Sequence, residues 1–162
     1  MAQLKHPAIA PDEYQVDEID KKVLRGYQLD ASLSYKELGD LIGLPPSTAF
    51  DRVKRLRKVG IIKAIVPLVN QEKLGFNTTA WILAKVEKGS DCCVVSSEIA
   101  KMPDVLEVHE IAGPYDIFVK VKARDNLDLH NISERVSNIK GVADAYSTVA
   151  LCTFKEDIRL NI

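Results

Sequence analysis

The stretch SYKELGDLIGLPPSTAFDRVKRLRKVG, residues 34–60, carries the clearest structural signals in this sequence of 162 residues. Ser34 followed by Glu37 is a capping box, in which each side chain satisfies a backbone N–H group at the start of a helix. Gly43 is suited to end that helix, because glycine readily adopts the left-handed conformation found there. Two prolines follow, and another helix is expected over about 46–59. The stretch therefore predicts two helices joined by a short turn.

The second of these helices has two different faces. At 100° per residue, one face gathers the apolar residues. These are Ala49, Phe50, Val53 and Leu56. The opposite face gathers polar and basic residues. These are Thr48, Asp51, Arg52, Arg55 and Lys58. The pattern predicts a helix anchored in a core by one side and exposed on the other.

Positive charge concentrates in residues 45–63, which hold six basic residues and one acidic residue. The whole chain is slightly acidic, with 22 Lys and Arg against 23 Asp and Glu. Two helices joined by a turn of about three or four residues that contains glycine, with the second helix basic, form the helix-turn-helix arrangement. The expected partner is therefore double-stranded DNA, whose phosphates attract Lys and Arg. The alternatives are a merely solvated charged face and a helical pair that binds another ligand.

The position of each residue on the second helix predicts its role on DNA. The leading turn would reach base edges, and later residues would contact phosphates. The residues expected near bases are Ser47, Thr48, Asp51 and Arg52. The residues expected near phosphates are Lys54, Arg55 and Lys58.

Outside this pair of helices, the N-terminal half contains three further segments. Residues 1–15 lack a repeating apolar pattern and are interpreted as a flexible arm. Asp17 is expected to cap a helix that fades by about residue 30, so that residues 16–62 form the helix-turn-helix domain. The run IIKAIVPLVN is rich in β-branched residues and predicts a short hairpin or wing, with residues 63–76 as a linker strand.

The C-terminal half contains an internal repeat. WILAKVEKG (81–89) matches DIFVKVKAR (116–124), and PDVLEVHEIA (103–112) matches KGVADAYSTV (140–149). A helical pattern lies between the strands of each copy; Ser90 is expected to cap the first helix and Asp125 the second. The order strand–helix–strand, given twice, predicts a ferredoxin-like βαββαβ domain over residues 77–156, followed by a tail over 157–162. The fold class is α+β.

Two helices on one face of a four-stranded sheet leave the other face open. Apolar residues that alternate along the strands would need cover on that face, and pairing with a second copy is the simplest way to provide it. A homodimer through the sheets is therefore expected.

The N-terminal half resembles the leucine-responsive/asparagine-responsive (Lrp/AsnC) regulators. The resemblance rests on a D-x-x-D opening, a capping box, and the family patterns G-L-S-x-S/T, R-V-x-R-L, G-I-I and K-L-G. These stand here at Asp17 and Asp20, Ser34 and Glu37, 43–48, 52–56, 60–62 and 73–75. This chain has Pro45 where the family usually has a serine cap. We expect Ser47 to cap the helix instead, starting it later.

The C-terminal half resembles the RAM domain (regulation of amino-acid metabolism) of the same regulators, through EIAGPYDIFVKV and the later G-V-x-x-x-x-S/T-x-V pattern. Together the halves cover residues 16–155. The resemblance implies a DNA-binding homodimer that often assembles to an octamer. It also implies an amino acid or related metabolite as effector, bound between RAM domains near the turn that joins the repeats.

The chemistry of that turn is compatible with an effector. Gly113 permits exposed N–H groups that could receive a carboxylate, Asp116 could accept hydrogen bonds from an α-amino group, and Thr148 could add a hydroxyl. The expected effector residues are Gly113, Pro114, Tyr115, Asp116 and Thr148. The alternative is a tight turn whose aspartate bonds only to its own backbone.

Several classes of function lack support in the sequence. No apolar run approaches the roughly 18 residues of a membrane span, and no signal peptide is recognisable, so a cytoplasmic protein is expected. Three cysteines, with Cys92 and Cys93 adjacent, do not suggest a disulfide framework or a zinc site. No catalytic constellation, metal site or cofactor motif is apparent, so we expect no enzyme.

Two other functions fit the same architecture. Siroheme decarboxylases share these two parts, and His109 is the only plausible catalytic histidine for that reaction. The basic helix argues against this enzyme. A metabolite sensor with a vestigial DNA-binding half is the remaining alternative, and the charge of residues 45–63 argues against it as well.

Overall fold

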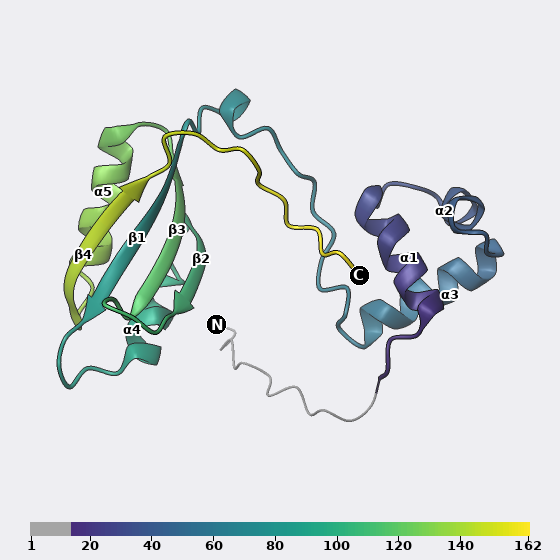
Figure 1. Cartoon of the computed structure of the whole chain (residues 1–162), viewed down its shortest axis with the longest axis horizontal. Coiled ribbons are helices and arrows are strands. Elements are labelled where there is room, and N and C mark those ends of the chain that lie inside the picture. Colours follow the sequence, from purple (N-terminus) through teal and green to yellow (C-terminus); the bar gives the residue numbers. More distant parts are fainter. Residues whose placement is uncertain (1–13) are drawn as a thin grey trace. The chain divides into compact units, whose positions relative to one another are not determined.

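The computed structural model describes residues 14–162, which fall into two compact units (Figure 1). The first comprises the described chain up to Pro67 together with Asp157–Ile162, and the second comprises Leu68–Glu156. Each unit has a hydrophobic core of its own. The arm expected over residues 1–15 lies outside the described residues, apart from its last two.

The first unit is built from three helices, α1 (Glu18–Leu29), α2 (Tyr35–Ile42) and α3 (Pro46–Lys58). Asp17 caps α1, and the capping box of Ser34 and Glu37 starts α2, as predicted. Gly43 ends α2 with φ of 70°, in the left-handed region that favours glycine. The core of the unit consists of Val23, Leu38, Ala49, Val53 and Leu56.

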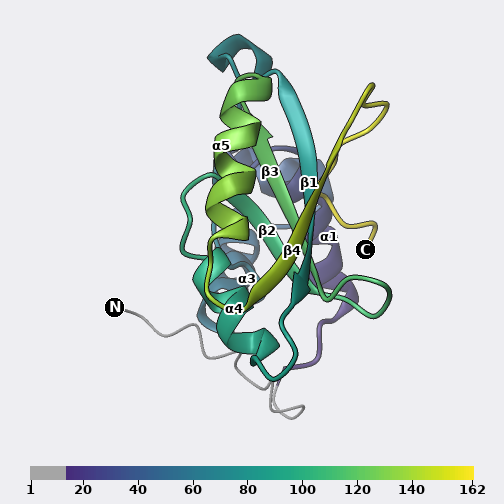
Figure 2. The ribbon, with the colours of Figure 1, turned by 90° about the vertical axis from the view of Figure 1, so that its left-hand side faces the viewer.

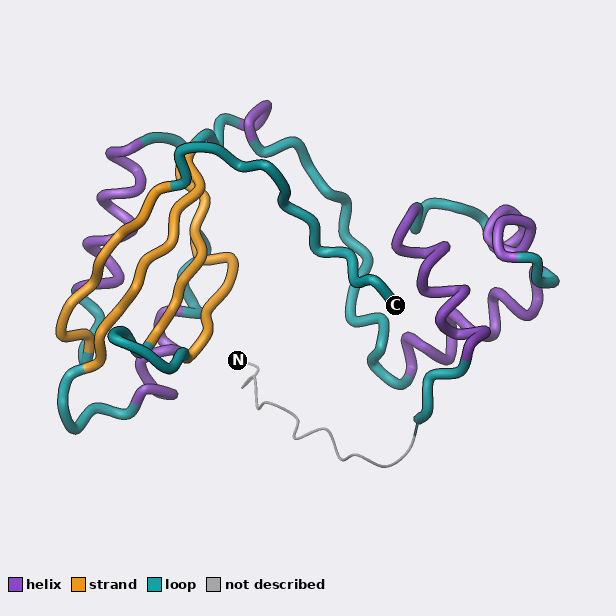
Figure 3. Tube along the Cα trace, viewed as in Figure 1, coloured by secondary structure: helices purple, strands orange, loops and turns teal. Residues whose placement is uncertain are grey.

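The strand or wing expected after α3 is not formed in the single chain. Residues 61–70 contain no strand, and only a short 3₁₀ helix, Glu72–Leu74, precedes the second unit (Figure 3). A β-branched run becomes a strand only where a neighbouring strand pairs with its N–H and C=O groups. Most of residues 61–70 are exposed to solvent; the exposed fraction is 64 % for Val66 and 72 % for Leu68.

The second unit is a four-stranded antiparallel sheet made of β1 (Thr78–Val86), β2 (Val105–Glu110), β3 (Ile117–Ala123) and β4 (Val142–Val149), in the order β2-β3-β1-β4. Helices α4 (Cys92–Ile99) and α5 (Asn126–Ser137) follow β1 and β3 and pack on one face of the sheet (Figure 2). The predicted ferredoxin-like order is confirmed. Asp91, one residue after the expected Ser90, caps α4.

The two faces of the sheet differ because side chains alternate along each strand. In β3, Val119 and Val121 are fully buried beneath the helices, whereas Phe118 and Lys120 point to the open face and are only partly buried. Trp81 lies on that open face too, since it pairs with Lys120 across the strands. Within the described residues, no helix has the length and apolar character needed to cross a membrane.

Candidate DNA-binding face and effector turn

The exposed face of α3 is the first candidate site. Ala49, Val53 and Leu56 are fully buried and fix the helix in the core. Most of the residues predicted to contact DNA are exposed. They are Ser47, Asp51, Lys54, Arg55 and Lys58. Thr48 and Arg52 are partly buried at one edge of the buried face, so they do not share this exposed surface.

The start of α3 differs from the expectation. Pro45 occupies the N-cap position with φ −57° and ψ 143°, and no side chain caps the helix. Ser47 lies inside the first turn, so the prediction that it caps a later start is wrong. A proline preceding a proline at the first helical position sets the backbone for helix entry without a side-chain acceptor. The first turn holds no acidic residue. The helix therefore presents a positive, uncapped end, which is suited to an anion such as phosphate.

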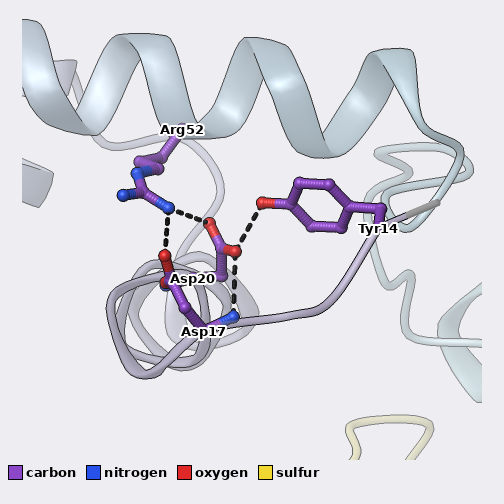
Figure 4. Close-up of polar contacts among 4 residues, drawn as sticks. All are labelled: Tyr14, Asp17, Asp20 and Arg52. Atoms are coloured by element: carbon purple, nitrogen blue, oxygen red, sulfur yellow. Dashed lines mark hydrogen bonds and ion pairs between the residues drawn. The ribbon is translucent and has the colours of Figure 1, made fainter.

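Arg52 points to α1 rather than to solvent (Figure 4). Its Nη1 lies 2.5 Å from Asp17 Oδ2 and 3.1 Å from Asp20 Oδ1. Asp20 is fully buried, and its other oxygen accepts hydrogen bonds from the Tyr14 hydroxyl and the Asp17 backbone N–H. The prediction that Arg52 shares the exposed face with Asp51 is therefore wrong.

The ionisation of this cluster follows its contacts. The backbone N–H of Asp20, then the guanidinium of Arg52, hold the pKa of Asp17 below its usual value. Burial, then the hydrogen bond to Asp20, raise the pKa of Tyr14. The Tyr14 hydroxyl thus stays protonated and donates a hydrogen bond to the carboxylate of Asp20. The cluster is a charge-assisted network between the start of α1 and the middle of α3.

The predicted position of the apolar face of α3 was wrong because it counted Phe50 as a core residue. Phe50 is 41 % exposed and packs edge-to-face on Tyr35 of α2, with ring centroids 5.1 Å apart. Counting it as core turns the apparent centre of the apolar face by roughly 20° at 100° per residue, away from Arg52. The three fully buried residues alone place Arg52 beside the core.

Two basic side chains of α3 rest on aromatic rings. The guanidinium of Arg55 lies 4.2 Å from the ring centroid of Tyr14, and the ammonium of Lys54 lies 5.8 Å from that of Phe50. Cation–π contacts at exposed sites contribute about 0.5–1 kcal/mol and restrict long side chains. Both cations are therefore held near the edges of the exposed face.

The turn between β2 and β3 is the second candidate site. Gly113, with φ of 155°, and Pro114 are exposed, while Tyr115 and Asp116 are partly buried. Asp116 accepts hydrogen bonds from the Val86 backbone N–H at 2.8 Å and from Lys85 Nζ at 3.0 Å. These contacts, that of Val86 first, lower the pKa of Asp116.

Asp116 thus binds the end of β1 and not its own turn, which differs from the tight-turn alternative. A carboxylate has about four acceptor positions, so these two bonds leave capacity for an amino group. Its side chain is 32 % exposed.

Thr148 does not join this turn within one chain. It pairs with Trp81, four residues before Lys85 on β1, a spacing of roughly 13 Å along a strand. Tyr146 is nearer, since it pairs with Leu83 and its ring stacks on Tyr115 with centroids 6.4 Å apart. Sequence reasoning missed Tyr146. The sequence pattern could have indicated Tyr146, because it lies two residues from Thr148 on the last strand and therefore on the same face of the sheet.

Comparisons with known proteins identify the two halves of the chain. Residues 16–63 match the family model of the winged helix-turn-helix DNA-binding domain, and residues 79–160 match that of the Lrp/AsnC ligand binding domain. The chain belongs to the Lrp/AsnC family of transcription regulators. It has the DNA-binding half and the ligand-binding half of an Lrp/AsnC regulator, in the expected order.

Similar Lrp/AsnC regulators cover almost the whole chain. The HTH-type transcriptional regulator FL11 of Pyrococcus furiosus is 37 % identical over 91 % of this chain and 97 % of its own. FL11 of Pyrococcus horikoshii is 35 % identical over the same shares. A Neisseria meningitidis transcriptional regulator, solved as an L-methionine complex, is 26 % identical, with a TM-score of 0.83 over 90 % of this chain and 96 % of that one. Escherichia coli AsnC, at 23 % identity and a TM-score of 0.80 over 88 % and 97 %, shows the shared fold.

Proposed function

We propose that this Lrp/AsnC regulator binds double-stranded DNA through the exposed face of α3. The observation that carries the proposal is an uncapped, acid-free helix start followed by exposed cations on one face. Phosphates would approach the first turn and Lys54, Arg55 and Lys58, while Ser47 and Asp51 would reach base edges. Thr48 is partly buried at the edge of this face, so it would contact a base only where the first turn of α3 comes close to that base. A cytoplasmic location is part of this proposal, in line with the expectation from the sequence.

Selection of bound fragments from genomic DNA at about 150 mM salt, with competitor DNA, tests this proposal. We expect a palindrome with half-sites about one helical turn apart. Lys58→Ala should weaken binding to all sequences and reduce the salt slope by about one contact. Asp51→Ala should alter base preference. Lys88→Ala removes an equal charge from an exposed loop of the other unit and should change nothing. Binding that is blind to sequence and unaffected by Lys58→Ala would refute the proposal.

We further propose an amino-acid effector at the β2–β3 turn, between the ligand-binding domains of assembled copies. Support comes from the free acceptor capacity of Asp116 and from the L-methionine complex of the N. meningitidis regulator. Calorimetry with a panel of amino acids would show saturable binding that Tyr146→Ala and Gly113→Val weaken. Thr148→Ala tests whether a partner copy supplies the hydroxyl that is distant within one chain. Saturable binding that neither Tyr146→Ala nor Gly113→Val weakens would contradict this location.

The assembly proposed here is a homodimer through the open faces of the sheets, with an octamer as the larger form. Support comes from the aromatic side chains on that face, Trp81 and Phe118, whose ring centroids lie 6.5 Å apart. Regulation rather than catalysis is the proposed activity. His109, which the enzyme alternative requires, is 58 % exposed on the open face, with its Nε2 3.5 Å from Glu107 Oε2.

A further inference from the structure

A buried carboxylate links α1 to the recognition helix α3. Asp20 is fully buried, and both of its oxygens are engaged. Oδ1 accepts from Arg52, while Oδ2 accepts from Tyr14 and from the backbone N–H of Asp17. Burying a carboxylate without such partners is very costly. The buried carboxylate therefore depends on these three partners, whose contacts are drawn in Figure 4.

The network restricts the rotation of α3 more tightly than the apolar core does. Val23 of α1 packs in one core with Val53 and Leu56 of α3. Contacts of this kind hold the apolar side of α3 against the core, but they are non-directional and tolerate small rotations and shifts of the helix. A guanidinium bonded to two fixed carboxylates is directional. Arg52 therefore limits how far α3 can turn or slide against α1.

The network also extends to the exposed face. Tyr14 donates to Asp20, and the guanidinium of Arg55 lies 4.2 Å from the centroid of the Tyr14 ring. Arg55 is one turn beyond Arg52 on α3. The same tyrosine thus connects the buried carboxylate with a cation at the edge of the DNA-facing surface.

We propose that Tyr14, Asp17, Asp20 and Arg52 form an orientation lock, in which Arg52 is a positioning residue for base recognition and not a base contact. The lock fixes the rotation of α3 and so decides which base edges its exposed residues reach. The inference rests on the proposed binding of DNA by this face. It assigns Arg52 a role opposite to the one that helical periodicity predicted.

The test compares full-length wild-type protein with Arg52→Ala, Arg52→Lys and Lys58→Ala. Affinities are measured for the selected operator and for operators with single substituted base pairs, from 50 to 200 mM salt. Circular dichroism confirms that each variant is folded at the temperature used. Both bonds of Arg52 come from one nitrogen, Nη1, so a lysine ammonium can replace it.

The lock predicts a broad loss of discrimination without a lost phosphate contact. A mismatched base pair ordinarily weakens binding roughly 5- to 150-fold. In Arg52→Ala these ratios should fall towards one at several positions, while the salt slope stays that of wild type. Arg52→Lys should restore the ratios. Lys58→Ala should lower the salt slope by about 0.9 and keep the ratios.

Three results would overturn the lock. A salt slope lowered by about one in Arg52→Ala would make Arg52 a phosphate contact. Loss of discrimination at a single base pair would make it a base contact, and unchanged ratios would leave it a purely structural residue. If Arg52→Ala does not fold, Tyr14→Phe removes only the hydroxyl donor and should lower the same ratios to a smaller extent; unchanged ratios there would equally refute the lock. Wild-type binding without preference would refute the proposed function itself, and the lock with it.

Discussion

Gly39 of α2 lies where the chain bends back towards α3, and the bend leaves no room for a side chain. A Cβ on Gly39 would lie 2.5 Å from the backbone oxygen of Leu44 and 3.3 Å from the nitrogen of Pro46. Both neighbours are backbone atoms of the turn, so they cannot move aside as a side chain could. We predict that Gly39→Ala lowers the free energy of unfolding by about 1–3 kcal/mol, as overpacking does, measured by urea denaturation with the helical circular dichroism signal.

A matched control is available four residues later. Gly43 has φ of 70° and nothing within 4 Å of its Cβ position. Asparagine tolerates this backbone region, so Gly43→Asn should change stability far less than Gly39→Ala. Equal losses in the two variants would show that the turn yields, and that the close approach at Gly39 has no energetic consequence.

Single residues also mark the limit of what the sequence could predict at the sites. The exposed positions Asp51, Arg55 and Lys58 follow from helical spacing, because spacing reports which side of a helix is apolar. The partners of Arg52 lie 32 and 35 residues earlier, and no local pattern identifies a contact across that separation. Periodicity therefore predicted the helix correctly and the direction of the Arg52 side chain wrongly.

At the scale of an element, α3 lacks the side-chain cap that stabilises α1 and α2. We predict that Pro45→Ser is more stable than Pro45→Ala by about 1 kcal/mol, because only serine adds an acceptor for the first-turn N–H groups. The comparison is made between these two variants because both lose the rigidity of proline in the unfolded chain. Thermal unfolding followed at the helical signal measures the difference. Identical stabilities would mean that the turn before α3 prevents serine from adopting a capping geometry.

Glu156, at the end of the second unit, binds two lysines of β3. It lies 2.7 Å from both Lys120 and Lys122, whose side chains are 16 % and 10 % exposed. The hydrogen bond to Lys120, then that to Lys122, lower the pKa of Glu156 below 4.5. A carboxyl group with a lowered folded-state pKa stabilises the fold above its unfolded value and loses that contribution as the pH falls through the folded value.

The pH dependence of stability tests this pair of bonds. Glu156→Gln should be less stable than wild type at pH 7, by roughly 1 kcal/mol or less for ion pairs of this exposure. The difference should shrink as the pH falls below about 4.5. Glu87→Gln, in an exposed loop, removes the same charge and should not show this dependence. A difference that persists unchanged at pH 3 would contradict an ionic origin.

Elements that depend on local chemistry were predictable, and those that depend on distant partners were not. The capping box at Ser34 and the repeated strand–helix–strand pattern sufficed for the helices and the sheet order. The linker strand expected over 63–76 is absent because its hydrogen-bonding groups meet no neighbouring strand in one chain. A strand is stabilised by its hydrogen bonds to a neighbouring strand, and the sequence of a single strand does not identify that neighbour.

For the whole molecule, we propose that copies associate through the open face of the sheet. Its lysines are already neutralised from within the chain, since Lys120 pairs with Glu107 and Glu156. A second copy therefore meets no excess of one charge. What remains to be covered is aromatic and aliphatic: Trp81, Leu83, Phe118 and Tyr146. Removing such surface from water drives association at about 25 cal/mol per Å².

We therefore predict that Phe118→Glu converts the proposed dimer into a folded monomer, because it places a charge in the centre of the apolar area. Sedimentation velocity gives the mass, and circular dichroism checks the fold. Val94→Glu is the matched control, because Val94 is 58 % exposed on α4, on the opposite side of the sheet. It should leave the dimer intact. Dissociation by Val94→Glu alone would move the interface to the helical face, and a monomeric wild type would refute pairing through the sheets.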